Sequence, residues 1–303
     1  MDWSSKTVVV TGAGRGIGLG LARHLARLGA AVVVNDAGVE LNGAPGDPEL
    51  AARVAAEIRT SGGRAVGCNQ SIADPTTGER LVQLALEQFG RLDAWVNAAA
   101  ITSDRMLFNM ADDAWLQVLS TNLSGTFFCM RAALKHFKQA RAGRLVNLIS
   151  TAGLIGNVGQ ANYAAAKAGM FALTRVAALE MTRYGVTVNC VAPFAYTRMT
   201  DSIKGATPEQ QTYLERARRA TVEHILPLLT LLLGDDAAEI SGQIFGARGD
   251  EIFLFSQPRP VCTIGQKGGW TYETVRAAVE SRMRPHFVPL QTDLELFQHE
   301  PLI

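Results

Sequence analysis

A strand, a glycine-rich loop and a helix follow one another at the start of the chain, and this succession constrains the fold more than any other stretch. Residues 7–11 read ThrValValValThr, a β-branched run without alternation, which is typical of a parallel strand buried on both faces. The segment ThrGlyAlaGlyArgGlyIleGly follows at residues 11–18. Behind it, an amphipathic helix is predicted from an apolar face at Ile17, Leu21, Leu25 and Leu28.

This succession predicts a dinucleotide-binding site. Small residues let backbone amides approach a pyrophosphate, and the helix N-terminus supplies a partial positive charge. A glycine motif alone would be weak evidence, but here the flanking elements are those that the mechanism requires. The loop residues expected to contact the cofactor are Gly12, Gly14, Arg15, Gly16, Ile17 and Gly18.

Asp36 follows the second buried strand, expected at residues 31–35. A carboxylate at this position can accept hydrogen bonds from an adenosine ribose and repels a 2′-phosphate, so NAD is expected rather than NADP. Two alternatives stay open. AspAlaGly is also good turn chemistry, so Asp36 could merely cap a turn, and Arg15 could meet a 2′-phosphate.

Strands and helices alternate along most of the chain. Further strands are expected at 64–69, 94–97, 143–149 and 187–192, and helices at 48–61, 76–89, 112–138 and 163–184. This alternation predicts an α/β fold with a right-handed, doubly wound parallel sheet of the Rossmann type. No break in composition marks a linker, so we expect one catalytic domain over residues 1–250. The extension at 251–303 is expected to pack on this domain or on a neighbouring subunit.

The candidate catalytic residues lie between Ser150 and Lys167. Ser150 follows the strand at 143–149 and so reaches the edge of the sheet where open α/β sheets bind ligands. Tyr163 and Lys167 are one helical turn apart in an alanine-rich helix, so phenol and ammonium leave the same face. Bringing an unperturbed tyrosine, with a pKa of ~10, to neutral pH requires roughly 4 kcal/mol of charge stabilisation. A Tyr and a Lys at this spacing are also a common accident of helix surfaces, and the flanking motifs favour the functional interpretation.

Asn122 lies inside the predicted helix at 112–138, where asparagine has poor helix propensity. It indicates either a local kink whose amide has a function or a tolerated polar residue.

Charge, hydropathy and cysteines exclude several classes of function. The chain has 29 basic and 28 acidic residues, which gives no electrostatic basis for binding nucleic acid or an anionic membrane. The apolar run at 225–233 is too short to span a bilayer, which needs about 20 residues, and is expected to be a core helix. No secretion signal or metal-ligand spacing is recognisable, so the cysteines are expected to be buried thiols in the cytoplasm and no metal site is expected. The expected partners are small molecules or further copies of this chain.

Together, the glycine loop, Asn97AlaAlaAla, Asn122, Ser150 and TyrAlaAlaAlaLys resemble the short-chain dehydrogenase/reductase family over about residues 5–250. The resemblance implies that Tyr163 is the general acid/base, and that Lys167 lowers its pKa and binds the nicotinamide ribose. Ser150 would hydrogen-bond the substrate oxygen, and Asn122 would hold a water that links Lys167 to solvent. Further cofactor contacts would come from Ser71, Asn97, Ala98, Pro193 and Thr197. The resemblance also implies a homodimer or homotetramer.

Four positions differ from the usual family pattern or stay ambiguous. Asn97AlaAla replaces AsnAlaGly, and Ser71 stands where an aspartate commonly contacts the adenine. Phe194 follows Pro193 in place of a glycine and is expected to crowd the nicotinamide side or to shape the substrate wall. Thr197 would bind the nicotinamide carboxamide or else cap a helix.

A closer resemblance, to the (3R)-hydroxyacyl-CoA dehydrogenase unit of peroxisomal multifunctional enzyme type 2 and its stand-alone bacterial relatives, rests on ValValValAsnAspAlaGly, GlyAsnValGlyGlnAlaAsnTyr and the long tail. It implies a role in lipid metabolism with an acyl-CoA substrate. Hydroxysteroids are the alternative substrates, and a catalytically silent nucleotide-binding sensor is the alternative from another class. Residues 200–222 are expected to form a substrate lid.

The tail carries expectations of its own. Phe253, Phe255 and Trp270 are expected to be buried against the domain, and residues 285–290 to be extended and to cross to a neighbouring subunit. Arg259 and Lys267 could meet an acyl-CoA phosphate or could be solvated surface charges.

Overall fold

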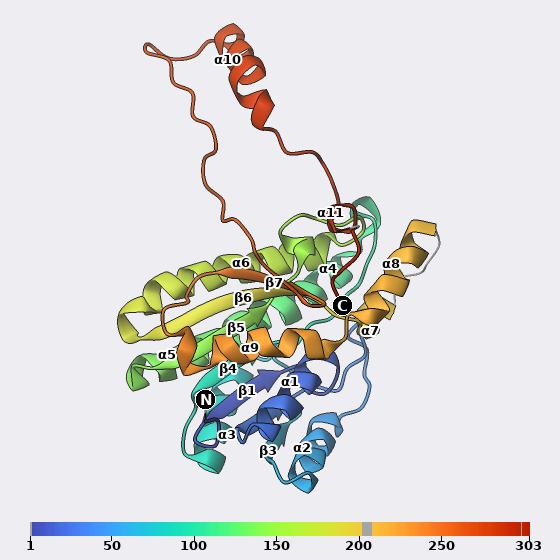
Figure 1. Ribbon diagram of the computed structural model, residues 1–303, viewed down its shortest axis with the longest axis vertical. Helices are drawn as coiled ribbons and strands as arrows, with labels where there is room; N and C mark the ends of the chain where they lie inside the picture. Colours follow the sequence, from blue (N-terminus) through green and yellow to red (C-terminus); the bar gives the residue numbers. More distant parts are fainter. Residues whose placement is uncertain (1, 202–207, 298) are drawn as a thin grey trace.

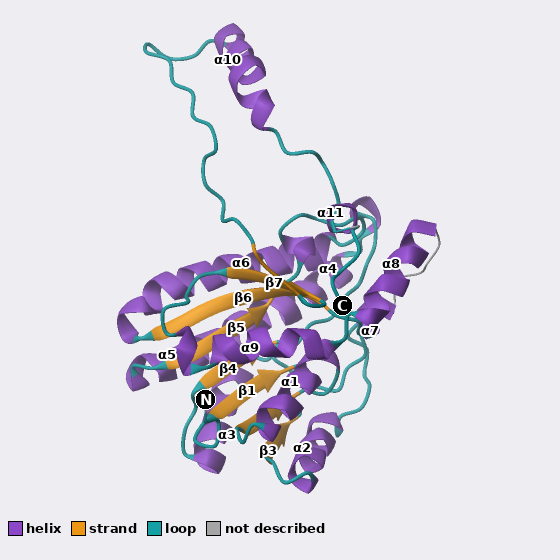
Figure 2. Cartoon of the chain, viewed as in Figure 1, coloured by secondary structure: helices purple, strands orange, loops and turns teal. Residues whose placement is uncertain are grey.

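The computed structural model describes residues 2–201, 208–297 and 299–303. They form a central sheet in which every neighbouring pair is parallel except the last, which is antiparallel (Figures 1 and 2). In spatial order the strands are β3 (Arg64–Cys68), β2 (Ala31–Asn35), β1 (Thr7–Thr11), β4 (Ala94–Asn97), β5 (Gly143–Leu148), β6 (Val186–Phe194), β7 (Ile244–Arg248) and β8 (Glu251–Leu254). The order reverses between β1 and β4, so the predicted doubly wound, Rossmann-type α/β fold is confirmed.

Helices cover both faces of the sheet (Figure 2). The helices are α1 (Gly16–Arg27), α2 (Leu50–Thr60), α3 (Thr77–Phe89), α4 (Asp112–Val118), α5 (Thr126–Ala140), α6 (Ala161–Met181), α7 (Arg198–Asp201), α8 (Pro208–Arg219), α9 (Leu226–Leu233), α10 (Tyr272–Ala278) and α11 (Asp293–Leu296). Buried side chains of α1, α2 and α9 pack on one face, and those of α3, α5 and α6 pack on the other. Of the predicted lid, residues 202–207 lie outside the described ranges.

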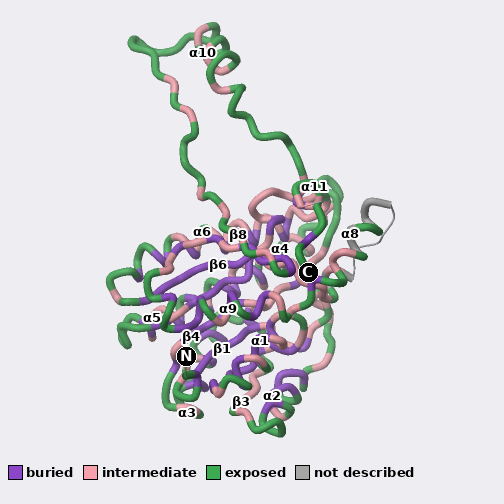
Figure 3. The backbone as a smooth tube through the Cα atoms, in the orientation of Figure 1, coloured by how far each residue is buried: buried purple, intermediate pink, exposed green. Residues whose placement is uncertain are grey.

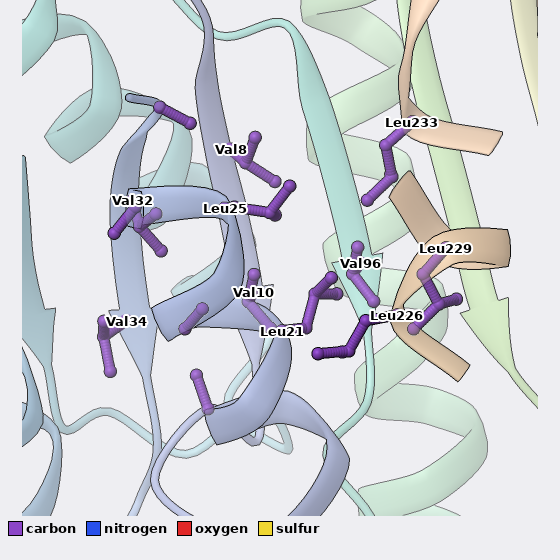
Figure 4. Packing of buried hydrophobic residues seen from close by; sticks show 14 of the residues in the cluster. Val8, Val10, Leu21, Leu25, Val32, Val34, Val96, Leu226, Leu229 and Leu233 are labelled. Atoms are coloured by element: carbon purple, nitrogen blue, oxygen red, sulfur yellow. The ribbon is translucent and has the colours of Figure 1, made fainter. Parts of the chain in front are cut away.

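The pleat of β1 divides the core into two layers. Val8 and Val10 point toward α1 and meet Leu21 and Leu25, whereas Val9 joins the cluster on the opposite face (Figure 4). Because the strand is covered on both faces, its unbroken β-branched run has no solvent-facing position. The apolar run at 225–233 supplies α9 to the first layer, as predicted. Within the described ranges, no helix has both the length and the apolar character needed to cross a bilayer.

The register of the strands brings the predicted site to one edge. Thr11 pairs in register with Asn35 of β2 and with Asn97 of β4, so three strands end side by side. The glycine loop, Asp36 and Ala98 therefore leave the sheet from the same edge. This is the C-terminal edge of parallel strands, where β5 also delivers Ser150.

The predicted helix at 112–138 is not continuous. Its first two turns form α4, and the segment Leu119–Gly125 then widens into a π-helix before α5 begins. Such wide turns often lie at functional sites. The predicted local kink is thus present, and Asn122 lies within it.

The C-terminal extension leaves the body of the molecule and returns to it. After β8 the chain runs outward, carries α10 at the far end, and comes back to form α11 (Figure 1). Phe253 and Phe255 are half-buried rather than buried, and both pack with Phe297. The expectation for Trp270 is wrong, because its side chain is 41 % exposed on the outward segment. Residues 284–286 form a 3-10 turn, and only 287–290 have no regular structure.

Candidate active site

Ser150, Tyr163 and Lys167 converge at the C-terminal edge of the sheet. Ser150 begins a short 3-10 turn after β5, where its Oγ accepts a hydrogen bond from the Ala152 amide at 3.1 Å. Tyr163 and Lys167 lie in the first turns of α6, and Lys167 Nζ is 5.5 Å from the centre of the Tyr163 ring. The Ser150 hydroxyl hydrogen-bonds the Tyr163 phenol. The structure therefore brings together the three side chains that the sequence predicts as a unit.

Burial governs the proton affinities of this unit. Tyr163 is 9 % exposed and Lys167 only 2 % exposed. Burial raises the pKa of Tyr163 to about 12, the hydrogen bond from Ser150 opposes this, and the charges of Asp104 and Asp293 add to it. Burial lowers the pKa of Lys167 to about 7. In the protein alone, the phenol is consequently protonated at neutral pH, and ionising it requires about 7 kcal/mol.

Lys167 is held by the sheet itself. Its Nζ donates a hydrogen bond of 2.7 Å to the carbonyl oxygen of Leu148, near the end of β5. This bond fixes the ammonium beside the phenol. The effect of burial thus exceeds any lowering of the Tyr163 pKa by Lys167 in the protein alone, so the predicted lowering requires further positive charge.

Asn122 ties the π-helix to the chain that follows β4. Its Oδ1 accepts from the Ile101 amide and its Nδ2 donates to the Ile101 carbonyl, both at 2.9 Å. The residue is fully buried, so the two bonds satisfy backbone groups that water cannot reach. The amide therefore has a structural function, and the water-holding role implied by the family stays a prediction.

The glycine loop fits a dinucleotide. Gly12 has φ +66° and a Cβ there would lie 2.6 Å from the backbone of Ala99, while a Cβ at Gly18 would lie 2.2 Å from the Gly12 carbonyl oxygen. Only glycine allows this close fold. Helix α1 begins at Gly16 without a side-chain cap and without an acidic residue in its first turn. Its terminal amides therefore point to where a phosphate would be held by backbone donors.

Asp36 organises the turn beside this loop. Its Oδ2 accepts from the Gly14 amide and its Oδ1 from the Gly38 amide, both at 2.8 Å. The turn-capping alternative is therefore correct, and it is compatible with ribose binding because each carboxylate oxygen has a second lone pair. Arg15 donates to the Val39 carbonyl at 2.9 Å and lies 3.8 Å from the Glu40 carboxylate. A neighbouring arginine, Arg198, is 3.7 Å from the same carboxylate.

The other predicted cofactor residues have differing surroundings. The Asn97 amide is used inside the core, where it accepts from Trp95 and donates to Asn147 at 2.8 Å each. The Ala98 amide donates to Thr11 Oγ1 at the strand ends. The side chain of Asn97 is thus a core element, and cofactor contact at this point is expected from the small residues that follow it.

Ser71 and Thr197 lie in loops that follow strands of the sheet, Ser71 after β3 and Thr197 after β6. Ser71 is exposed after β3, and its hydroxyl accepts from the Ala73 amide at 3.3 Å. Thr197 lies beside the glycine loop, with its Cγ2 at 3.4 Å from a Cβ built at Gly16. Both positions are compatible with their predicted roles.

Phe194 packs under the C-terminal segment. Its ring lies 4.8 Å from the ring of Phe297 and 6.2 Å from that of Phe253, while Pro193 pairs with Ala247 within the sheet. Arg248, which follows on β7, donates to the carbonyls of Phe297 and His299. The predicted substrate wall at Phe194 is therefore connected to the last residues of the chain.

Asp293 is a site residue that sequence reasoning missed. Its Oδ2 accepts a 2.6 Å hydrogen bond from the hydroxyl of Thr151, the neighbour of Ser150, and its amide donates to the Gly156 carbonyl at 3.3 Å. The residue is 6 % exposed, and burial raises the pKa of its carboxyl group. ThrAspLeuGlu at 292–295 is a helix-start signature, but nothing in it indicates a contact with Thr151.

Comparisons with known proteins agree with this geometry. A family model described as short chain dehydrogenase matches residues 6–210. The hydroxyacyl-CoA dehydrogenase ChsB1 of Mycobacterium tuberculosis is 41% identical over 265 residues, which are 85% of this chain and 81% of that protein. A 3-oxoacyl-[acyl-carrier-protein] reductase of Synechocystis is 39% identical, covering 83% of this chain and 98% of that protein.

The crystal structure of a short chain dehydrogenase from Mycobacterium avium superposes with a TM-score of 0.82 at 35% identity, covering 96% of this chain and 99% of that one. A peroxisomal hydratase-dehydrogenase-epimerase of Neurospora crassa is 34% identical over 83% of this chain, which spans 27% of that longer protein. The predicted resemblance to hydroxyacyl-CoA dehydrogenases, stand-alone and within a multifunctional enzyme, is thereby confirmed.

Proposed function

The chain belongs to the short-chain dehydrogenase/reductase family, and from this premise we propose that it transfers a hydride between NAD(H) and a (3R)-3-hydroxyacyl-CoA/3-oxoacyl-CoA pair. Membership of the family makes it an oxidoreductase that acts on a CH–OH group and uses a nicotinamide dinucleotide. The observation that carries the proposal is the convergence of Ser150 with the buried side chains of Tyr163 and Lys167, beside a glycine loop that leads into a helix without a side-chain cap. The choice of NAD, the (3R) configuration and the CoA carrier are its finer parts.

The proposed chemistry assigns one role to each side chain. A bound nicotinamide dinucleotide supplies or accepts the hydride. The Ser150 hydroxyl orients the substrate oxygen toward Tyr163, and the Tyr163 hydroxyl gives its proton to that oxygen during ketone reduction. Lys167 provides a cation beside the phenol that stabilises the phenolate left behind. In the protein without cofactor the phenol is protonated at neutral pH, which is the form that ketone reduction needs.

The preference for NAD rests on the charges around the adenosine end. Asp36 places a carboxylate beside the glycine loop, and Glu40 lies close to both Arg15 and Arg198. A 2′-phosphate entering this region would meet two carboxylates as well as two guanidinium groups. The test is kcat/KM with NADH and with NADPH: Asp36→Ala is expected to relax the selection against NADPH. A wild-type protein that already prefers NADPH would overturn this assignment.

The substrate class rests on the likeness to hydroxyacyl-CoA and 3-oxoacyl-carrier enzymes. The decisive experiment follows NADH consumption with acetoacetyl-CoA, longer 3-oxoacyl-CoAs, an acyl-carrier-protein thioester and keto-steroids. Turnover highest with CoA thioesters supports the proposal. Highest turnover with the carrier-protein thioester or with keto-steroids would move the assignment to those substrates. Cofactor binding without any turnover would favour the nucleotide-binding sensor, which otherwise lacks support because all three catalytic side chains are in place.

A further inference from the structure

Residues 37–48, here called the strap, connect β2 to α2. Strand β2 ends at Asn35 and α2 begins at Leu50, whereas a strand-to-helix connection usually has about 2–6 residues. The strap leaves the edge of the sheet and runs toward α7 (Figure 1), and apart from Gly38 its residues are half-buried or exposed (Figure 3). A connection of this length in a compact domain is usually either functional or disordered.

The strap is ordered by its own hydrogen bonds. The Asp47 amide donates to the Gly38 carbonyl at 2.7 Å, which joins the two limbs at their base. At the tip, the Glu40 amide donates to the Ala44 carbonyl at 2.8 Å, and the Gly43 amide donates to the Glu40 carbonyl at 2.9 Å. Compact surface loops whose ends meet in this way are frequently functional. The strap is therefore a folded element with a defined tip.

The tip of the strap contacts segments that follow β4. The Thr102 amide donates to the Leu41 carbonyl at 2.9 Å, and a Cβ built at Gly43 would lie 2.4 Å from the side-chain nitrogen of Gln117. Because the spatial order of the strands is β2–β1–β4, a loop that leaves β2 and a segment that leaves β4 can meet only across the end of β1. The strap therefore bridges the edge of the sheet at the point where the glycine loop begins.

The strap contacts both parts of the expected cofactor site. The Val39 carbonyl accepts a hydrogen bond of 2.9 Å from Arg15 of the glycine loop. The Val39 side chain packs against the buried cluster that contains Tyr163 and Ile101. The strap thus extends from the loop expected to hold the pyrophosphate to the cluster around the catalytic tyrosine. A dinucleotide that binds between these two points has to pass the strap.

One carboxylate holds the strap to two other segments. Glu40 lies 3.8 Å from Arg15 Nη2 and 3.7 Å from Arg198 Nη1. Arg198 Nη1 also lies 3.4 Å from the Val39 carbonyl oxygen. Arg15 precedes α1 and Arg198 begins α7, so these contacts connect the strap to both helices. The ion pairs of Glu40 with Arg15 and Arg198, here called the latch, therefore hold three segments together.

We propose that the strap is a gate for the nicotinamide dinucleotide and that the latch keeps this gate closed. The latch is formed in the protein alone, so the strap has to open before a dinucleotide can enter and again before it can leave. Glu40 and Arg198 are accordingly positioning residues, which act on the cofactor through the strap. The gate depends on the dinucleotide-binding part of the proposed function, and neither on the acyl substrate nor on the choice of NAD.

Removing the latch should accelerate both directions of cofactor exchange. Glu40→Gln removes both ion pairs, and Arg198→Gln removes one of them. Stopped-flow fluorescence measures the association of NADH, and a chase with excess NAD measures its release. Because exposed ion pairs contribute little individually, we expect each rate constant to rise about three- to tenfold in Glu40→Gln and less in Arg198→Gln. The dissociation constant should change by less than about threefold, because a gate changes the rates of entry and release together.

Glu79→Gln is the matched control. Glu79 pairs with Lys135 at 3.1 Å, and its side chain is 62 % exposed, close to the 55 % of Glu40. This variant should leave both rate constants unchanged. Arg198→Lys retains the positive charge and should release NADH more slowly than Arg198→Gln. Raising the salt concentration should accelerate release from the wild type, because salt screens exposed ion pairs, and should have little effect on Glu40→Gln.

Hydrogen exchange reports on the gate without any cofactor or substrate. The Thr102 amide is bonded to the Leu41 carbonyl of the strap, so its exchange with solvent requires the strap to open. We expect this amide to exchange about three- to tenfold faster in Glu40→Gln than in the wild type, and at the wild-type rate in Glu79→Gln.

Unchanged rate constants and unchanged exchange of Thr102 in Glu40→Gln would overturn the gate. Faster association with unchanged release would also overturn it, because the strap would then only obstruct the empty protein. The same measurement with NADPH defines a third contrary result: an effect confined to NADPH would assign Glu40 to charge repulsion at the adenosine end. If both NADH rate constants rise while no acyl thioester is turned over, the gate stands and the proposed substrate fails.

Discussion

Substitutions of Asp293 can distinguish the effect of its hydrogen bond with Thr151 from the effect of its charge on Tyr163. Asp293→Ala removes the acceptor of the 2.6 Å bond from Thr151 and leaves a buried hydroxyl unpaired next to Ser150. A hydrogen bond to a charged group is worth about 1.5–3 kcal/mol. If this amount is lost from the alignment of Ser150 in the transition state, kcat/KM falls roughly ten- to hundredfold.

Asp293→Asn keeps an acceptor for Thr151 and removes only the charge. Its kcat/KM at neutral pH is expected to stay within about threefold of the wild type. The charges that face Tyr163 are those of Lys167, Asp104 and Asp293, and the two carboxylates raise the pKa of the phenol. Removing one carboxylate should therefore shift the pH profile of alcohol oxidation, which needs the phenolate, toward lower pH.

The pH dependence of the unfolding free energy tests the same carboxyl group independently. Burial raises the folded-state pKa of Asp293 above its ordinary value of 3.8, so the folded protein binds this proton more tightly than the unfolded chain. The group therefore stabilises the fold at acid pH and loses that contribution as the pH rises through the folded-state pKa. Asp293→Asn should flatten this dependence in urea unfolding.

The assay is steady-state kinetics across pH for both variants, with Thr151→Val as the matched change on the donor side. Because the two side chains share one bond, the double variant Asp293→Ala with Thr151→Val should be little worse than either single one. Wild-type kcat/KM in Asp293→Ala, or equal losses in the Ala and Asn variants with an unmoved pH profile, would refute the reasoning.

Three further predictions follow from buried groups. Asn122→Ala leaves the amide and carbonyl of Ile101 unpaired, so the unfolding free energy measured by urea denaturation should fall by about 2–6 kcal/mol. A loss of less than about 1 kcal/mol would contradict the structural function of the Asn122 side chain. Gly18→Ala forces a Cβ against the Gly12 carbonyl, so cofactor binding measured by fluorescence titration should be lost, and wild-type affinity would show that the loop tolerates a side chain. Because burial lowers the folded-state pKa of Lys167 to about 7, the unfolding free energy should rise from about pH 7 toward pH 10. Lys167→Met should remove this rise. The same dependence of unfolding free energy on pH in both proteins would contradict the prediction.

The parts of the fold set by local pattern were predictable. The strand at Thr7–Thr11 and the loop after it are recognisable because burial on both faces and close backbone approach each demand particular residue types at adjacent positions. Tyr163 and Lys167 were predictable because helical spacing alone brings them to one face. Ser150 followed from the rule that parallel strands end at a common edge.

Contacts between distant segments were not predictable. The partner of Asp293 is 142 positions away in sequence, and the partner of Asn122 is 21 positions away, so no local pattern reports either bond. Trp270 was expected to be buried against the domain because large apolar side chains usually are buried, yet it lies exposed on the segment that runs outward after β8 (Figure 1).

The central claim is that Tyr163 is the acid that completes hydride transfer. Tyr163→Phe removes one hydroxyl from a ring that is 9 % exposed, so the fold and the glycine loop should be unaffected. The most direct measurement is the steady-state rate of NADH oxidation with a 3-oxoacyl-CoA by this variant, beside its NADH affinity from fluorescence titration. We expect wild-type affinity together with a rate at least about a hundredfold lower. Substantial turnover by a variant that binds NADH normally would contradict the account.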